Sequence, residues 1–228
     1  MKRSLFSYLW QWLIPNRCVF CSCMIDEKAT LCSTCEKLEK GLRLTSCPKC
    51  GHPFSLCVCH AAPEGPDLLL YPFSYRDPHI SSAIKRFKTY GYGTYARFFS
   101  FRMALLAQNY PQLKEVDVVC SIPVHHTLLR EKGFDHAEVL ARHLACLLKK
   151  EYRSLLIKTR TTSPQKSLTA AQRKKNLHNC FSVNGQVPRY VLLVDDITTT
   201  GSTLREAVRT LKKSGVKKVY CITAAAVV

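Results

Sequence analysis

The stretch YVLLVDDITTTGST (residues 190–203) determines which fold this chain can adopt. Its first five residues are hydrophobic and include branched side chains, which is typical of a buried strand. Polarity changes abruptly at Asp195 and Asp196, and a helical pattern begins at about Ser202. Open α/β sheets bind their ligands at such strand ends, so the stretch predicts a ligand site.

The polar turn after this strand has the composition of a phosphate site, and its members are Thr198, Thr199, Thr200, Gly201, Ser202 and Thr203. Turn amides and the positive end of the following helix dipole meet at one point, and Gly201 lets the backbone approach closely. The carboxylates of Asp195 and Asp196 can accept hydrogen bonds from a sugar beside that phosphate. The alternative is an acidic strand end with an ordinary helix cap. A P-loop is disfavoured because G-x4-G-K-[ST] is absent.

Strand and helix patterns alternate along the rest of the chain. Strands are predicted at 116–122, 155–158, 181–183, 190–194 and 219–228, and helices at 128–149 and 204–213. This alternation predicts an α/β fold with a mainly parallel sheet. Two prolines and a glycine within residues 61–66 mark a boundary, so we place the larger domain at 66–228.

The head of the chain is rich in cysteine. Of 13 cysteines, nine precede residue 60, and eight of these form close pairs: Cys18 and Cys21, Cys32 and Cys35, Cys47 and Cys50, and Cys57 and Cys59. Two C-x2-C knuckles supply the four sulfurs of tetrahedral zinc. A disulfide framework is the alternative, but no export signal supports it. We predict a zinc ribbon at 16–62 with one or two structural zinc ions and Cys23 as a spare thiol, because this segment is too poor in apolar residues to fold without metal.

The charge of the chain predicts an anionic partner, since 34 Lys and Arg against 16 Asp and Glu give a formal net charge of +18. No stretch reaches the roughly 18 uninterrupted apolar residues of a membrane-spanning helix. Residues 1–15 predict a short amphipathic helix that docks on the body, with contact to a membrane surface as the alternative. We expect no membrane span and a cytoplasmic location.

Two segments concentrate the positive charge. Residues 149–175 hold nine basic residues and one acid, and the segment 159–172 within them, which lacks apolar periodicity, predicts a mobile loop that closes over pyrophosphate or follows a nucleic-acid backbone. Residues 78–114 combine basic and aromatic side chains, as single-stranded nucleic acid requires. We favour the alternative that Phe98, Phe99 and Phe101 are core residues of a helix.

The residues 194–203 closely resemble the motif of type I phosphoribosyltransferases that binds phosphoribosyl pyrophosphate (PRPP). Further strings resemble successive motifs of the ComF family, whose members carry a double zinc ribbon before a phosphoribosyltransferase-type domain: Ser121 to His125, Arg130 with Gly133 to His136, and Arg160, Gln165, Leu168, Arg173, Asn176 and Phe181. The resemblance covers nearly all of residues 18–228. In two places the chain departs from the family pattern, since Asp135-His136 replaces the usual Asn-Gln and the pair at Cys57 is one residue shorter.

This resemblance implies a role for each candidate residue. Asp195 and Asp196 would be the catalytic pair that holds the ribose hydroxyls, and the turn from Thr198 to Thr203 would bind the 5′-phosphate. The pyrophosphate with its Mg²⁺ would lie in the loop formed by Pro123, Val124, His125 and Arg130. The mobile loop would contribute Arg160, Gln165 and Arg173. The implied partners are PRPP, single-stranded DNA and other DNA-uptake proteins of natural transformation.

Two functions stay open from the sequence. One is an enzyme that transfers phosphoribose from PRPP to an unidentified acceptor and releases pyrophosphate. The other is a non-catalytic accessory protein that binds single-stranded DNA and uses PRPP only as a ligand, or not at all. The sequence identifies neither a general base nor the acceptor.

Overall fold

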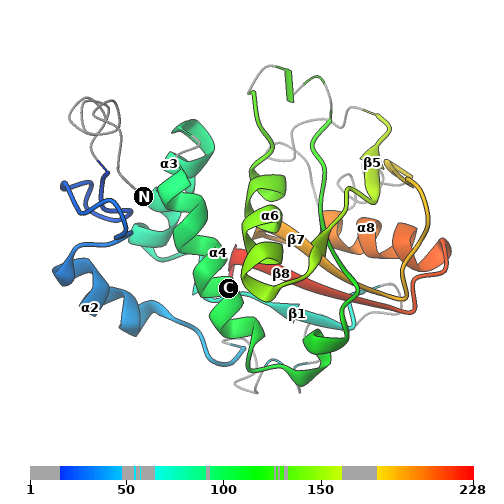
Figure 1. Cartoon of the computed structure of the whole chain (residues 1–228), viewed down its shortest axis with the longest axis horizontal. Coiled ribbons are helices and arrows are strands. Elements are labelled where there is room, and N and C mark those ends of the chain that lie inside the picture. Colours follow the sequence, from blue (N-terminus) through cyan, green and yellow to red (C-terminus); the bar gives the residue numbers. More distant parts are fainter. Residues whose placement is uncertain are drawn as a thin grey trace, which may run out of the picture.

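The computed structural model describes residues 16–47, 54, 57, 65–90, 93–125, 127, 129–130, 133–160 and 179–228. The predicted helix at 1–15 lies outside these residues, as do Cys50, Cys59, Gln165 and Arg173. The cysteine-rich head contributes one described helix, α2 (Ser33–Leu42). In Figure 1 this head lies to one side of the domain that carries the sheet.

A parallel sheet forms the centre of the larger domain. Its strands are β1 (Leu68–Leu70), β2 (Phe73–Ser74), β3 (Val118–Ser121), β4 (Glu151–Tyr152), β7 (Tyr190–Thr198) and β8 (Lys218–Ala226). Their order is β1-β8-β7-β3-β4, with β2 also paired to β8, and all of these pairs are parallel. A separate antiparallel pair consists of β5 (Leu156–Lys158) and β6 (Phe181–Val183). The predicted mainly parallel α/β fold is confirmed.

Helices cover both faces of this sheet (Figure 1). They are α3 (Pro78–Tyr90), α4 (Gly93–Ala107), the 3₁₀ helix η2 (Pro111–Glu115), α6 (His136–Leu148) and α8 (Ser202–Lys213). The connections through α3, α4 and α6 move toward β4, whereas the connection through α8 moves from β7 to β8 in the opposite direction. Because such crossovers are right-handed, α8 lies on the face opposite α4 and α6. The direction reverses between β3 and β7, where open sheets bind their ligands.

Several element boundaries differ from those predicted. The helix expected from residue 128 is divided: residues 127, 129 and 130 are helical, and α6 begins at His136, because Asp135 accepts hydrogen bonds from the first-turn amides and Gly133 has a φ of 77°. The strand expected to end at Val194 continues through the acidic pair to Thr198, because its ladder with β8 extends that far. The short strands β1, β2 and β4 were not predicted.

The phenylalanines of α4 are divided between core and surface. Phe98 and Phe99 are buried, as we predicted, and the ring of Phe98 stacks on Phe73 with centroids 5.8 Å apart. The prediction was wrong for Phe101, which is 46% exposed. Among the tyrosines, Tyr95 is buried and Tyr90 is exposed. The rings of this segment that could stack on bases are therefore fewer than its composition suggested.

A buried ion pair joins the head to the domain. The carboxylate of Glu39 on α2 lies 2.8 Å from Nε of Arg102 on α4 and 3.3 Å from Nε of Arg43. The ring of Phe20 packs edge-on against Phe98, with centroids 5.4 Å apart. The backbone N–H of Leu44 donates to a carbonyl just before β2. The head thus shares side-chain packing and charge pairing with the domain.

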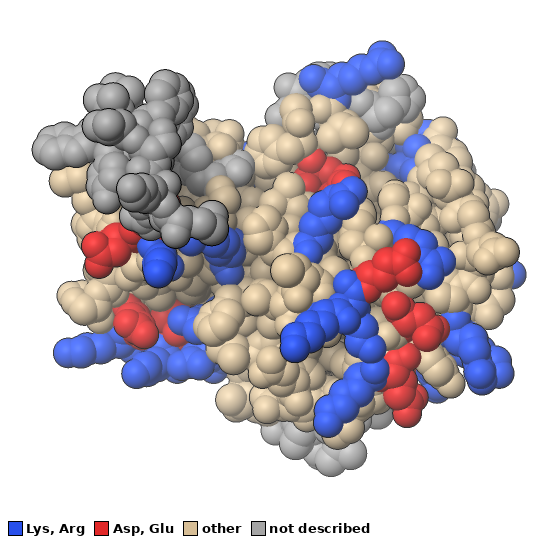
Figure 2. All heavy atoms as spheres, in the orientation of Figure 1, with Lys and Arg blue, Asp and Glu red and all other residues tan. Residues whose placement is uncertain are grey.

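The positive charge of the chain is distributed over the surface. Figure 2 shows Lys and Arg in several groups over one face, with Asp and Glu among them. Some of these cations form exposed ion pairs, such as Arg142 with Glu138 and Arg153 with Glu151. The described part of this face therefore carries positive and negative side chains side by side. Among the helices that the structure describes, none has the length and apolarity to cross a membrane.

Candidate functional site

A pocket of about 330 Å³ lies at the carboxyl end of β7. Its lining consists of Tyr75, Lys88 and the continuous run from Asp195 to Leu204. The structure thus brings the predicted acidic pair and the predicted phosphate turn to one concave spot. Tyr75 follows β2 and Lys88 lies on α3, so both come from a distant part of the sequence.

The phosphate turn is shaped by its glycine and by an arginine. Gly201 precedes α8 with a φ of 70°, a conformation that L side chains rarely adopt. The hydroxyls of Thr200 and Ser202 lie 2.9 Å apart, and Nη2 of Arg205 donates to the Thr200 carbonyl at 2.8 Å. Arg205 therefore adds a positive charge to the amino end of α8. Sequence reasoning missed Arg205, although its position one turn beyond Ser202 was a usable signal.

The acidic pair, Asp195 and Asp196, brings two carboxylates close together, which is electrostatically unfavourable. The amide of Asp196 donates to Oδ1 of Asp195 at 2.8 Å. Burial, together with repulsion from Asp196, raises the pKa of Asp195 well above its ordinary value. Nζ of Lys88 lies 2.8 Å from Oδ2 of Asp196. Burial disfavours the ammonium, but the two carboxylates outweigh it and raise the pKa of Lys88, so Lys88 stays charged.

The loop after β3 lies beside the acidic pair. The amide of Ile122 donates to the carbonyl of Val194 at 2.9 Å, which keeps the loop next to β7. His125 is buried, and its Nδ1 lies 2.9 Å from Oγ1 of Thr127. Arg130 is exposed. The described pocket lining includes none of the predicted pyrophosphate residues Pro123, Val124, His125 and Arg130.

The unusual pair Asp135-His136 connects this loop to α3. One carboxylate oxygen of Asp135 caps α6, and the other accepts from the amide of Val124 at 2.9 Å. Burial raises the pKa of Asp135, although these amides oppose the shift. Nε2 of His136 donates to the carbonyl of Lys88 at 3.0 Å, and its ring packs edge-on against Phe87. The pair Asp135-His136 thus supports the loop and Lys88 together.

The structure describes the two ends of the chain that flank most of the predicted mobile loop, the first at Arg160 and the second at Asn179. Arg160 is exposed at the first end, after β5, and burial lowers the pKa of the neighbouring Lys158. At the second end, the amide of Asn179 donates to Glu206 on α8 at 2.6 Å. Glu206 also pairs with the buried Arg209 at 2.6 Å. The second end is therefore anchored on α8.

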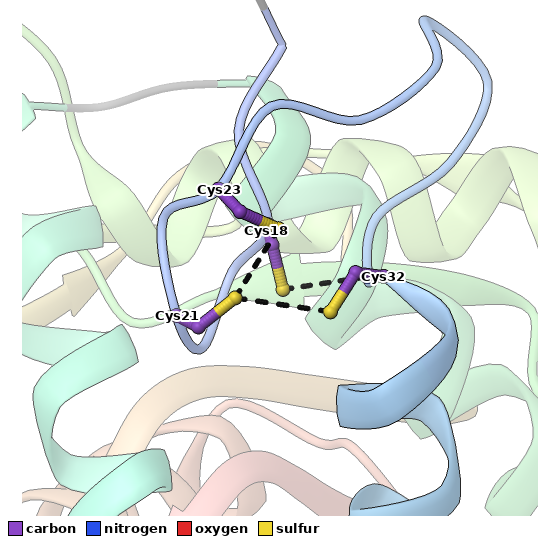
Figure 3. Close-up of side chains that lie close together, drawn as sticks. All are labelled: Cys18, Cys21, Cys23 and Cys32. Atoms are coloured by element: carbon purple, nitrogen blue, oxygen red, sulfur yellow. Dashed lines mark hydrogen bonds between the residues drawn. The ribbon is translucent and has the colours of Figure 1, made fainter.

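Four thiols of the head converge on one point. The sulfurs of Cys18, Cys21, Cys23 and Cys32 all lie within 4.8 Å of one another (Figure 3). Those of Cys21 and Cys32 are 3.8 Å apart. Tetrahedral zinc with Zn–S bonds of about 2.3 Å requires a sulfur separation of about 3.8 Å. The backbone N–H of Cys23 lowers the pKa of the Cys21 thiol to about 6, which favours the thiolate that binds metal. The cluster therefore fits structural zinc.

Cys23 joins this cluster, contrary to our expectation of a spare thiol. Ser22 has a φ of 63°, and this turn directs Cys23 back toward Cys21. Cys35, the expected fourth ligand, is not among the four clustered thiols, but it interacts with the thiols of both Cys32 and Cys21. The Cys21 and Cys23 sulfurs lie only 3.3 Å apart, closer than a tetrahedral site requires. Five thiols are thus available to the first site. At the second site, the described thiols are those of Cys47, which is buried, and Cys57.

Comparison with known proteins gives the same two modules. A model of the double zinc ribbon domain matches residues 9–65, and a model of the phosphoribosyl transferase domain matches residues 129–227. Fold and site therefore define a protein with a zinc ribbon and a phosphoribosyltransferase-type domain.

Several curated relatives match most of the chain. Competence protein F of Haemophilus influenzae is 30% identical over 220 residues, which cover 89% of this chain and 93% of the relative. The DNA utilization protein YhgH of Escherichia coli K12 is 30% identical over 205 residues, 84% of this chain and 89% of the relative. The chain belongs to the ComF family. Among solved structures, the allosteric regulatory enzyme of purine biosynthesis is 25% identical with a TM-score of 0.38, covering 57% of this chain and 25% of its own.

Proposed function

We propose that this protein binds PRPP in the pocket at the end of β7 and acts in the uptake and use of external DNA. One observation supports the binding proposal above all: the acidic pair, the hydroxyl-rich turn and the amino end of α8 line one pocket at the point where the sheet topology reverses. The names of the two relatives, a competence protein and a DNA utilization protein, support the DNA role.

The 5′-phosphate and ribose of PRPP would occupy the described pocket. The turn from Thr198 to Thr203 offers hydroxyls and first-turn amides to the phosphate, and Arg205 adds positive charge there. The ribose hydroxyls would donate to Asp195 and Asp196, which must be ionised to serve as strong acceptors. Lys88 stabilises that ionised state through its contact with Asp196.

The pyrophosphate would lie toward the loop after β3. Pro123, Val124, His125 and Arg130 keep their proposed role there, with Val124 fixed by Asp135. Mg²⁺ would bind the pyrophosphate oxygens and reduce their negative charge. Closure of the mobile loop, with Arg160, Gln165 and Arg173, would exclude water from the anomeric carbon if transfer occurs.

Calorimetry with PRPP and Mg²⁺ on zinc-replete protein tests this site. We expect Asp195→Ala combined with Asp196→Ala to abolish binding and to retain the fold, as judged by circular dichroism. The matched control, Glu115→Ala combined with Glu151→Ala, removes two negative charges at exposed positions and should leave the affinity unchanged. Unchanged affinity in the first variant would refute the assignment.

Turnover separates an enzyme from a ligand sensor. Pyrophosphate release from PRPP should be measured with and without single-stranded DNA and with candidate bases. Release that depends on the acidic pair and on an added acceptor would establish phosphoribosyl transfer. Binding without release under every condition would establish a non-catalytic role.

Direct binding of single-stranded DNA is a second candidate function. The formal net charge of +18 and the naming of one relative as a DNA utilization protein favour it. The logarithm of affinity should fall linearly with the logarithm of salt concentration, at a slope near −0.7 per phosphate contact. Absence of binding, or binding that salt does not weaken, would remove this candidate. Contacts with other DNA-uptake proteins and the cytoplasmic location stay predictions.

We also propose that Cys18, Cys21 and Cys32 hold a structural zinc ion, with Cys23 or Cys35 as the fourth ligand. The sulfur spacing and the backbone N–H of Cys32, which donates to Cys18 Sγ at 3.4 Å, support this proposal. The ion would supply folding free energy to the ribbon at 16–62, and the domain would begin at 66. A second site at Cys47, Cys50, Cys57 and Cys59 stays a prediction.

A further inference from the structure

We propose that α3 couples the first zinc knuckle to the PRPP pocket, because Arg86 is held by the knuckle and Lys88 is thereby positioned at the acidic pair. The inference rests on the proposed PRPP site and adds a positioning residue and a structural connection to it. Its evidence comes from three independent sets of contacts: those of Arg86, those of the Lys88 ammonium, and those of the Lys88 backbone.

The knuckle holds α3 through two backbone carbonyls and a serine hydroxyl. Nη1 of Arg86 donates to the carbonyl of Phe20 at 2.9 Å and to Oγ of Ser22 at 2.9 Å, and it lies 3.4 Å from the carbonyl of Val19. All three acceptors lie on the turn that carries Cys18, Cys21 and Cys23 (Figure 3). Nearer the start of α3, the ring of His79 lies 5.8 Å from that of Phe20. The turn thus contacts α3 at two positions, Arg86 and His79.

The other end of this connection is Lys88, two residues after Arg86. Its ammonium lies 2.8 Å from Asp196 and lines the pocket. Its carbonyl accepts from Nε2 of His136. PRPP carries several negative charges, so a cation fixed beside two carboxylates reduces the repulsion that the ligand meets on entry. Lys88 therefore influences affinity through Asp196, without being placed on the reacting atoms.

The position of Lys88 in α3 makes it dependent on such contacts. The helix ends at Tyr90, so Lys88 belongs to its last turn. Carbonyls of a last turn lack intrahelical partners, and tertiary contacts provide most of the stability of a short helix. Loss of the knuckle contacts should therefore loosen the last turn and allow the Lys88 ammonium to leave Asp196.

Hydrogen exchange of zinc-loaded, ligand-free protein tests the connection without PRPP. In Arg86→Met, amides of residues 84–90 should exchange at least ten-fold faster than in wild type, with zinc content unchanged. Lys85→Met, an exposed position on the same helix, should exchange at the wild-type rate. Equal protection in Arg86→Met and wild type would overturn the proposal. Faster exchange accompanied by zinc loss would also count against it, because the ribbon itself would then have unfolded.

Calorimetry with PRPP tests whether the connection reaches the pocket. Lys88→Met should weaken binding at least ten-fold, Lys88→Arg should restore most of the affinity, and Lys85→Met should change nothing. Arg86→Met should weaken binding in the wild-type background but by less than two-fold once Lys88 is Met, because its effect passes through Lys88. If Arg86→Met instead weakens PRPP binding by the same factor in the wild-type and Lys88→Met backgrounds, the proposed coupling is overturned. If wild type itself gives no heat, the PRPP site fails, and hydrogen exchange alone decides the connection between knuckle and helix.

Discussion

Replacement of Glu39 by alanine should destabilise the whole protein, because the Glu39 side chain is 1% exposed and its carboxylate lies 2.8 Å from Nε of Arg102. The Arg102 side chain is 13% exposed, and burial lowers its pKa even though Glu39 opposes the shift. Breaking a buried ion pair from one side typically costs about 3–5 kcal/mol. A chain of this length loses about 2–4 °C per kcal/mol, so we expect the unfolding temperature to fall by about 10 °C.

Thermal unfolding followed by circular dichroism in zinc-containing buffer provides the measurement. Glu36→Ala is the matched control, since this residue is exposed on the same helix and surface substitutions change stability by about 0.5 kcal/mol or less. Glu39→Leu combined with Arg102→Leu should recover most of the loss, because no unpaired charge then remains. A Glu39→Ala variant as stable as Glu36→Ala would refute the reasoning. So would a double variant whose loss of stability equals the sum of the losses in Glu39→Leu alone and Arg102→Leu alone.

Three further predictions concern the two sites. Asp195→Asn should stabilise the protein at neutral pH, because burial raises the pKa of Asp195 in the folded state and ionisation of this carboxyl therefore destabilises the fold. This destabilisation is fully present above the folded-state pKa and disappears as the pH falls below the unfolded-state pKa of about 3.9. The unfolding temperatures of variant and wild type should therefore converge in acid. Cys18→Ala should reduce the zinc content found by metal analysis, whereas the exposed thiol control Cys146→Ala should not; equal zinc in both would contradict the cluster. Gly201→Ala should cost about 1–2 kcal/mol in denaturant unfolding, because its φ is positive, and should weaken PRPP binding; a variant as stable as wild type would contradict the turn geometry.

Local sequence patterns were sufficient for the parallel character of the sheet, for three of its strands (β3, β7 and β8) and for most of the pocket. The residues 190–203 are contiguous, so a strand, a turn and a helix start already place their carboxylates, hydroxyls and amides together. The parallel arrangement followed from alternation of hydrophobic runs with helical patterns. These features depend on neighbours in the chain, which a sequence displays directly.

Contacts between distant segments could not be predicted in the same way. Lys88 and Tyr75 reach the pocket only because α3 and β2 pack beside β7 and β8, and no local pattern specifies that packing. The inclusion of Cys23 in the cluster depends on the left-handed conformation of Ser22, a residue type for which that conformation is uncommon. The apolar pattern predicted one continuous helix from residue 128, but Gly133, which has a positive φ, interrupts it before α6.

The contact between Arg86 and the knuckle uses main-chain carbonyls of Val19 and Phe20, which every amino acid can provide. Side chains on that turn other than Ser22, whose hydroxyl also accepts from Arg86, can therefore change during evolution without loss of these two contacts, provided that the spacing between the cysteines is kept. A chimera with the ribbon of another family member should join correctly if its knuckle has the same length. Insertion of a single residue there would shift both carbonyls out of register with the arginine.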